Sequence, residues 1–200
     1  MKRSTVKSLF NIEPKEQEVI VKGWVRSLRK SKTFCFIVLN DGSCQKDIQV
    51  IAGDDLEGYE EFTKCLTGSA LSIKGKLVPS QGKQPIEVQA LEINIIGSTP
   101  TEYPLQKKGT SLEFLREIAH LRPRTNLFGA VFRVRHELTQ ATHKFFSEKG
   151  FYNIHTPILT AMDAEGAGEL FRVSTLDPEN TARGKDGKVI WEKDYFGQQA

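Results

Sequence analysis

Basic and aromatic side chains gather in one stretch near the start of the sequence. Residues 19–40 contain five lysines and arginines and no acid, and Phe34 and Phe36 close the stretch. Lysine and arginine attract phosphates, and exposed aromatic rings stack on unpaired bases. The pattern predicts a surface for single-stranded RNA, while a solvated basic strand beside core phenylalanines is the open alternative. The five cations are Lys22, Arg26, Arg29, Lys30 and Lys32.

Gln49 stands between Ile48 and Val50 in a run of strand-forming residues. Because side chains alternate across a strand, its amide should point away from the apolar interior. An amide carries a donor and an acceptor, so it could read the Watson–Crick edge of a base. An ordinary outward polar residue explains the same pattern equally well.

An acidic, glycine-containing loop covers residues 163–169, with the sequence Asp-Ala-Glu-Gly-Ala-Gly-Glu. Its glycines let a backbone or a ligand approach closely. Glu165 and Glu169 could therefore hold an ammonium group. A turn with solvated acids is the alternative for this loop.

The first hundred residues contain the elements that must position the basic stretch and Gln49. Five apolar runs predict strands, and a helix is expected at residues 55–66 because its apolar positions share one face. Five strands with a helix between the third and fourth match the order of an OB-fold, a barrel that binds oligonucleotides. Another small five-stranded barrel fits the strand count as well. The predicted strands cover residues 19–25, 34–39, 48–51, 70–78 and 86–96.

The second half begins with a proline- and glycine-containing linker at residues 97–109, followed by a short helix at 111–120. A long helix comes next, with one apolar stripe that Asn126 could cap and Gly150 could end. The stripe predicts a buried interface, with an ordinary core helix as the alternative. Its residues are Leu127, Val131, Val134, Leu138, Ala141 and Phe145.

After this helix the sequence predicts one strand and one loop. Residues 151–159 resemble a strand that contains Pro157, which cannot donate to a ladder and places the strand at an edge or at its end. Residues 177–191 hold many charges, one proline and two glycines, and predict a polar loop.

Composition restricts the class of protein more than its function. The chain has 200 residues, a net charge of +3 and three cysteines without a CxxC pair. The small net charge means that a nucleic-acid partner must be argued from local clusters. The odd cysteine count argues against a disulfide framework and gives zinc no support. With no signal peptide and no run of about 18 apolar residues, we expect a cytoplasmic protein.

Several motifs together resemble the class IIb aminoacyl-tRNA synthetases, the aspartyl, asparaginyl and lysyl enzymes. Residues 23–26, 34–43 and 48–50 resemble their anticodon-binding domain. Residues 120–124, the long helix and Thr156-Pro157 resemble the first class II motif, which forms the dimer interface. Residues 165–171, Glu-Gly-Ala-Gly-Glu-Leu-Phe, are most similar to the asparaginyl-tRNA synthetase member. The chain thus resembles the N-terminal portion of that family.

The resemblance implies roles for individual residues. Phe36 matches the aromatic that stacks on an anticodon base, and Gln49 matches the reader of the central uridine. Arg29 matches a basic anticodon contact. Pro157 and the stripe residues belong to the dimer motif. Glu165 matches the loop glutamate near the amino group of the amino-acid substrate.

The same resemblance defines the expected architecture, an α+β multidomain chain. An OB-fold anticodon-binding domain is expected at 1–100, a linker at 101–125, and the truncated start of an antiparallel-sheet class II catalytic domain at 126–200. The second and third class II motifs, whose arginines hold ATP with Mg²⁺, have no counterpart in these residues. Phosphoryl chemistry depends on positioned positive charge, so we expect this chain to be inactive alone and to be a fragment.

The family reaction would attach asparagine to its tRNA through an aminoacyl-adenylate, with a homodimer as the assembly. Two alternatives remain. An aspartyl or lysyl relative lacks support because the arginine-containing version of the 165–171 loop is absent. A stand-alone, non-catalytic tRNA-binding module fits the present residues equally.

Overall fold

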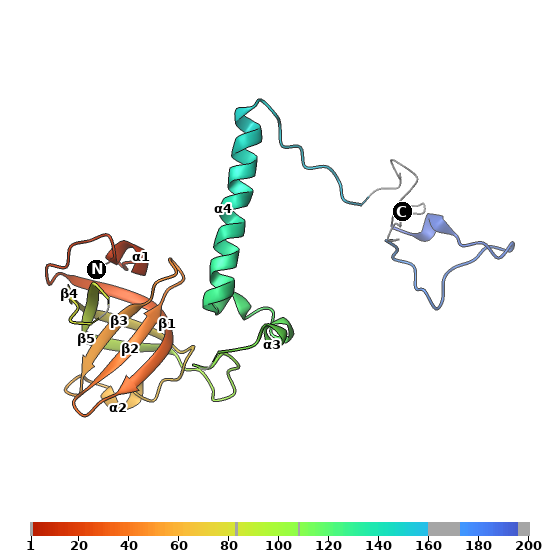
Figure 1. The fold of residues 1–200 in the computed structure, drawn as a ribbon. Helices are drawn as coiled ribbons and strands as arrows, with labels where there is room; N and C mark the ends of the chain where they lie inside the picture. The colour runs from red at the N-terminus through yellow and green to blue at the C-terminus, as the bar shows by residue number, and fades with distance from the viewer. Residues whose placement is uncertain (1, 83, 108, 160–172, 196–200) are drawn as a thin grey trace. The chain divides into compact units, whose positions relative to one another are not determined.

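The computed structural model describes residues 2–82, 84–107, 109–159 and 173–195. Five strands close into a barrel in the order β1-β2-β3-β5-β4 (Figure 1). Strands β3 and β5 run parallel, and every other neighbouring pair is antiparallel. All five predicted strands are confirmed, and the first runs further than expected. The strands are β1 Glu18–Lys30, β2 Phe34–Asn40, β3 Ile48–Gly53, β4 Ala70–Pro79 and β5 Ile86–Gly97.

Alternating apolar residues fill the barrel, because every second side chain of a strand points inward. Residues such as Ile37, Val50 and Ile73 are completely buried. Two short helices, α1 (Val6–Leu9) and α2 (Tyr59–Phe62), lie at opposite ends of the barrel (Figure 1). Each contributes two buried residues to the same core. These helices cap the core that holds the strands in register.

Helix α2 is much shorter than the predicted helix at 55–66. Gly58 precedes it with a φ of 75°, in the left-handed region that an α-helix cannot include. The helix ends four residues later at Phe62. The amphipathic spacing at 55–66 therefore comes from turns on either side of one helical turn. Helix α1 was not predicted.

A connection with one short helix leads from the barrel to the long helix. It contains α3 (Leu112–Glu117) and the 3-10 turn η1 (Arg122–Arg124). Helix α4 then spans Asn126–Glu148. The predicted cap at Asn126 is wrong: the Thr125 hydroxyl accepts from the Phe128 N–H at 3.3 Å and takes that position.

The predicted end of α4 at Gly150 is confirmed. Gly150 has a φ of 85°, which a residue with a side chain adopts only at a cost. The Phe151 N–H donates to the Phe146 carbonyl at 3.1 Å, and the two rings meet edge to face at 5.6 Å. The Gly150 N–H also donates to the Ser147 carbonyl at 3.0 Å, and the two hydrogen bonds define a Schellman motif, which satisfies the last carbonyls of the helix.

The chain packs as two compact units, residues 1–139 and 140–200, with the division inside α4. In the second unit the predicted strand at 151–159 is wrong. A strand needs a partner strand for its backbone groups, and no described residue forms a β-ladder with this segment, whose side chains are exposed. The polar loop at 177–191 is confirmed; it carries an Arg183–Val189 bridge and is followed by the turn η2 (Trp191–Lys193).

No helix in the described part of the chain is both long enough and apolar enough to cross a membrane.

Candidate nucleic-acid interface

Arg29, Phe36 and Gln49 line one open groove of about 660 Å³ on the outside of the barrel. Pairing of the strands brings them together. Arg29 on β1 lies opposite Phe36 on β2, and Gln49 on β3 lies opposite Val38 on β2. The groove thus combines a cation, an aromatic ring and an amide within three adjacent strands. Its other lining residues are Ser27, Phe34, Val38, Ile51, Gln81, Gly82, Glu87 and Lys107.

A β-bulge in β1 turns Arg29 toward the groove. Counted from buried Val25, simple alternation would place Arg29 inside the barrel. Val25 lies opposite Leu39, yet Ser27 lies opposite Val38, so Arg26 is an extra residue between them. A bulge of this kind shifts every later side chain to the other face. Arg29 is consequently exposed beside Phe36.

The two phenylalanines form the aromatic part of the groove. Phe34 and Phe36 are half-buried, whereas Cys35 between them is completely buried. Their rings meet edge to face at 5.0 Å. Such a pair fixes both ring planes while part of each ring stays in contact with solvent. The groove therefore has a surface on which an unpaired base can stack.

Gln49 is held by polar partners from β5 and from the β4–β5 loop. Its Nε2 donates to Glu87 Oε2 at 3.1 Å, and the Ser80 hydroxyl donates to the same oxygen at 2.7 Å. The Gln49 backbone N–H donates to Gln84 Oε1 at 3.3 Å. Glu87 is only 5% exposed, so this network lies at the bottom of the groove. Glu87 was not among the residues predicted from the sequence.

Four of the five cations of the basic stretch do not line the groove. Lys30 pairs with Glu60 at 3.0 Å and lies 5.0 Å from the centre of the Tyr59 ring. The hydrogen bond to Glu60 raises the pKa of Lys30, and burial of Cys35 beside it raises that thiol's pKa to about 11. Of the five, Arg29 alone lines the groove. One member of the basic stretch thus reaches the groove, and the role of the stretch as an RNA surface stays a prediction.

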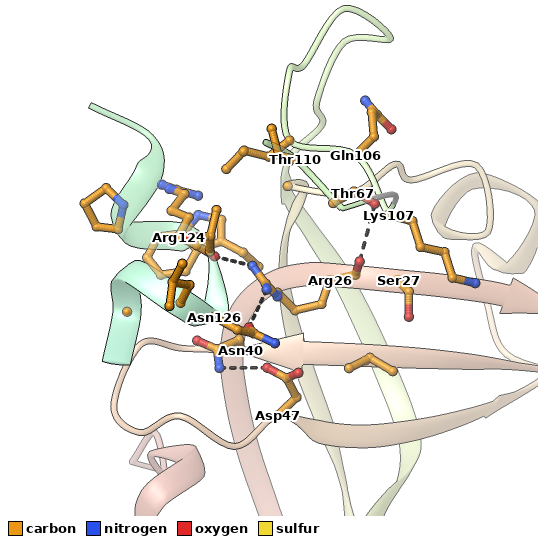
Figure 2. A pocket seen from close by; sticks show the side chains of 18 of the residues that line it. Arg26, Ser27, Asn40, Asp47, Thr67, Gln106, Lys107, Thr110, Arg124 and Asn126 are labelled. Atoms are coloured by element: carbon orange, nitrogen blue, oxygen red, sulfur yellow. Dashed lines mark hydrogen bonds between the residues drawn. The ribbon is translucent and has the colours of Figure 1, made fainter. Parts of the chain in front are cut away.

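Arg26, the bulge residue, joins the barrel to the start of α4. Its guanidinium donates to the Arg124 carbonyl and, at 2.7 Å, to Asn126 Oδ1 (Figure 2). The Arg124 guanidinium in turn lies 4.5 Å from the centre of the Trp24 ring. These contacts bring together residues about a hundred positions apart, which no local pattern could reveal.

A second hollow of about 610 Å³ lies beside this junction. Arg133 of α4 closes one side, donating to the Gly42 carbonyl at 2.7 Å and to Gln45 Oε1 at 3.1 Å. In Figure 2, Lys107 extends over β1 next to Ser27. Ser27, Val38 and Lys107 line both hollows, so the groove and the junction are neighbours on the barrel surface.

Asp41 in the β2–β3 turn fastens the N-terminal segment to the barrel. Its carboxylate accepts from the Val6 N–H at 3.0 Å and pairs with Arg3 at 3.3 Å. Burial raises the pKa of Asp41. Hydrogen bonds from Ser43 and Val6 and the charge of Arg3 lower the pKa by more, so the net pKa lies below its usual value. The same turn therefore holds α1 through Asp41 and α4 through Gly42.

Asp194 plays a comparable part in the second unit. It accepts from the Thr175 N–H at 2.7 Å and from the Ser174 hydroxyl at 2.7 Å. The hydrogen bonds from Thr175 and Ser174 lower the pKa of Asp194 to about 2. One carboxylate thus ties the two ends of the polar loop.

The stripe residues of α4 are exposed in this structure. Leu127 is 55% exposed, Val131 38%, Val134 58% and Leu138 62%. Pro157 lies in the exposed segment that follows the helix. The predicted substrate-binding residue, Glu165, lies outside the described residues. The groove residues are therefore brought together, while the stripe forms a separate apolar face.

The described residues do not fit ATP with Mg²⁺. They contain no group of three histidine, cysteine or acidic residues that could hold a metal ion. The two arginines expected from the second and third class II motifs have no counterpart among residues 1–200. No chemical step can be derived through the nucleotide from this chain.

Comparison with known families divides the chain into two matched segments. Residues 19–96 match the family of OB-fold nucleic acid binding domains. Residues 111–182 match the class II tRNA synthetases of the D, K and N type.

Curated relatives cover the whole chain. The asparagine–tRNA ligases of Desulfitobacterium hafniense and Alkaliphilus oremlandii are 54% and 49% identical to it over 202 aligned residues. The alignment covers 100% of this chain and 44% of each relative, so the chain spans less than half the length of these enzymes.

Solved structures share the fold. Asparaginyl-tRNA synthetase from Pyrococcus horikoshii matches with a TM-score of 0.71 over 80% of this chain and 38% of that one, at 20% identity. The same enzyme complexed with asparaginyl-adenylate matches with a TM-score of 0.76 over 86% of this chain and 40% of that one. Along its whole length the chain is similar to the N-terminal portion of asparagine–tRNA ligases, and its two matched segments are an OB-fold barrel and the start of a class II synthetase domain.

Proposed function

We propose that this chain supplies the tRNA-reading part of an enzyme that attaches asparagine to tRNA(Asn) with ATP, through an aminoacyl-adenylate. The observation that carries the proposal is the 54% identity to an asparagine–tRNA ligase along the entire chain. The relatives that match at this level are asparagine ligases, which favours asparagine over aspartate or lysine as the amino acid.

In this proposal the groove on the barrel binds the anticodon loop. Phe36 stacks on an anticodon base, Gln49 reads the central uridine, and Arg29 contacts the RNA as a cation. The support is that all three line one groove that also offers an aromatic surface and a buried polar floor. Affinity for RNA of this kind depends on phosphate charge, and selectivity depends on base contacts.

The proposal also assigns a role to each part of the chain. Residues 1–100 form the anticodon-binding domain, 101–125 the linker, and 126–200 the first part of the catalytic domain. Glu165 approaches the amino group of asparagine. ATP and Mg²⁺ bind outside the residues present, so these 200 residues by themselves form no adenylate. The three free cysteines are consistent with a cytoplasmic location.

A second copy of the chain is the proposed cover for the α4 stripe. Exposed apolar side chains recur along one face of a 23-residue helix, with Leu127, Val131 and Val134 each more than a third exposed. A contiguous apolar surface of this kind marks an interface. Pro157 would lie at the same interface in the homodimer.

A chimera tests the proposed function directly. This chain replaces the aligned part of the Desulfitobacterium relative, and charging of tRNA is measured with asparagine, aspartate and lysine. Charging with asparagine alone is expected, and charging with aspartate or lysine would contradict the assignment. The chain alone should show no asparagine-dependent exchange of pyrophosphate into ATP.

Base reading by Gln49 is tested with RNA hairpins that differ only in the central loop base. Gln49→Ala should weaken binding to the uridine hairpin more than to the others, by about tenfold for a lost base contact. Gln89→Ala is the matched control, because Gln89 is an exposed glutamine of β5 that does not line the groove. Equal weakening for all hairpins would refute the reading role.

A further inference from the structure

We propose that the hollow beside the junction of the barrel with α4 binds a small ligand that carries a diphosphate group, such as a nucleoside diphosphate. This junction hollow measures about 610 Å³, a size typical of small-molecule sites. The proposal goes beyond the proposed function, in which RNA binds to the groove and the ATP of the reaction binds outside the residues present. It therefore concerns a second site with its own ligand.

Four cations from separate elements line the junction hollow. In Figure 2, Arg26 lies at the middle of it, with Arg124 beside it on the segment that leads into α4. Cations gathered around one concave surface create a positive potential that attracts an anion. The four are Arg26 of β1, Lys107 of the linker, Arg124 of η1 and Arg133 of α4.

Acidic side chains leave most of this charge uncompensated. No acid among the described residues forms an ion pair with any of the four cations. The Arg26 guanidinium donates to the Arg124 carbonyl and to Asn126 Oδ1, which are neutral acceptors. The Arg133 guanidinium also donates to neutral oxygens. Among the described residues that line the hollow, Asp47 is the one acid, and it already accepts from a neighbouring amide at 2.8 Å.

The junction fixes two of the guanidiniums before a ligand arrives. Arg26 is held by two hydrogen bonds and Arg133 by three. Each guanidinium has five N–H donors, so both can still donate to phosphate oxygens. Side chains that are already ordered lose little entropy on binding. Because the cations come from different sides of the hollow, a ligand with two phosphates can contact more of them than one with a single phosphate.

Apolar and aromatic side chains complete the junction hollow. Leu105 and Leu115 line it and are nearly completely buried, and an apolar wall strengthens the attraction between charges beside it. Trp24 also lines it and is 40% exposed, with the Arg124 guanidinium 4.5 Å from the centre of its ring. An aromatic ring next to a cation suits the base of a nucleotide. A cavity of this size accommodates one nucleotide, whereas a length of RNA needs an open groove.

Binding is tested by titrating the whole chain with pyrophosphate, ADP and adenosine, without added metal ions. Calorimetry measures affinity, and the indole N–H signal of Trp24 in NMR spectra reports on the hollow. Pyrophosphate and ADP should bind with a Kd below about 1 mM and shift the Trp24 signal. The signal of Trp191, which does not line the hollow, should stay in place. Adenosine should not bind, because it carries no phosphate.

Arg124→Gln and Arg122→Gln form a matched pair of variants. Both arginines belong to η1 and lie against aromatic rings, but Arg124 lines the hollow and Arg122 does not. Arg124→Gln removes one cation and should weaken pyrophosphate binding about fivefold to tenfold. Arg122→Gln should leave the affinity unchanged. Added salt should weaken binding to the unsubstituted chain, because screening reduces the attraction between partly exposed charges.

Several outcomes would overturn the proposal. One is a folded chain that binds neither pyrophosphate nor ADP at millimolar concentration, and another is binding of ADP and adenosine without pyrophosphate. Equal weakening in both arginine variants would assign the effect to general surface charge. Binding of RNA hairpins is measured in parallel, and Arg124 does not line the groove. If Arg124→Gln weakens hairpin binding while pyrophosphate does not bind, the cations serve RNA instead. Loss of hairpin binding by the unsubstituted chain would overturn the proposed function and leave the diphosphate site intact.

Discussion

Gly75 should be a position where a single methyl group damages both the barrel and the groove. A Cβ at Gly75 would lie 2.3 Å from the Gln89 carbonyl oxygen and 2.7 Å from Val88 Cγ1. The first neighbour is backbone and cannot rotate away. To restore an ordinary contact, β4 and β5 must separate locally by about 1 Å, which strains ladder hydrogen bonds worth about 1 kcal/mol each. With the cost of overpacking added, we expect Gly75→Ala to destabilise the barrel by about 2–4 kcal/mol.

The functional consequence follows from the register. Val88 and Gln89, which the methyl group would displace, are paired with Val50 and Ile51 of β3, next to the Gln49–Glu87 pair. Pushing β5 outward at this point should lengthen the hydrogen bond from Gln49 Nε2 to Glu87. Gly75→Ala should therefore weaken binding to the uridine hairpin even at temperatures where the barrel is folded.

Thermal unfolding and hairpin binding measure the two effects. A loss of about 3 kcal/mol corresponds to a fall in Tm of roughly 10–20 °C for a domain of this size. Gly97→Ala is the control, because a Cβ at this glycine of β5 would meet no atom within 4 Å beyond its chain neighbours. If Gly75→Ala unfolds at the same temperature as Gly97→Ala, the close approach of β4 and β5 is not what requires glycine.

Three further predictions concern other parts of the chain. Because its pKa is lowered to about 2, Asp194 should hold the polar loop above about pH 4 and release it as the pH falls toward 2, seen as faster amide exchange at Thr175. Exchange that stays constant over this range would contradict the role of the carboxylate. Val134→Asp should shift a dimer to monomer in sedimentation, whereas Glu137→Asp on the same helix should not; an unchanged mass refutes the stripe as the interface. Deleting Arg26 should keep Arg29 in the groove and preserve RNA binding. The junction between the barrel and α4 should be weakened by about 1–2 kcal/mol, seen as faster amide hydrogen exchange at Gly129. Loss of RNA binding would show that the bulge itself is needed.

Much of the barrel could be predicted because strand alternation is a local signal. Ile48 and Val50 point inward, so Gln49 between them had to point outward, and the structure places it on the outer surface. The same signal was available for Glu87, between Ile86 and Val88. It was missed because an outward polar residue is ordinary, and its burial depends on the loop that carries Ser80.

Other features could not be found from neighbouring residues. Arg133 contacts Gly42 and Gln45, about ninety positions earlier in the chain, and nothing in the pattern of α4 marks it as different from other surface arginines. The strand expected at 151–159 does not form, although its composition suits a strand. A strand exists only where another segment supplies hydrogen bonds, and composition carries no information about that partner.

The bulge in β1 shows why a run of basic residues cannot be treated as one binding surface. In sequence Arg26 and Arg29 are equivalent members of a cluster. In the structure the extra residue at position 26 reaches Arg124 and Asn126, while the shift that it causes turns Arg29 to the opposite side of the strand from the core. One irregularity thus assigns one arginine to the junction with α4 and the other to the groove.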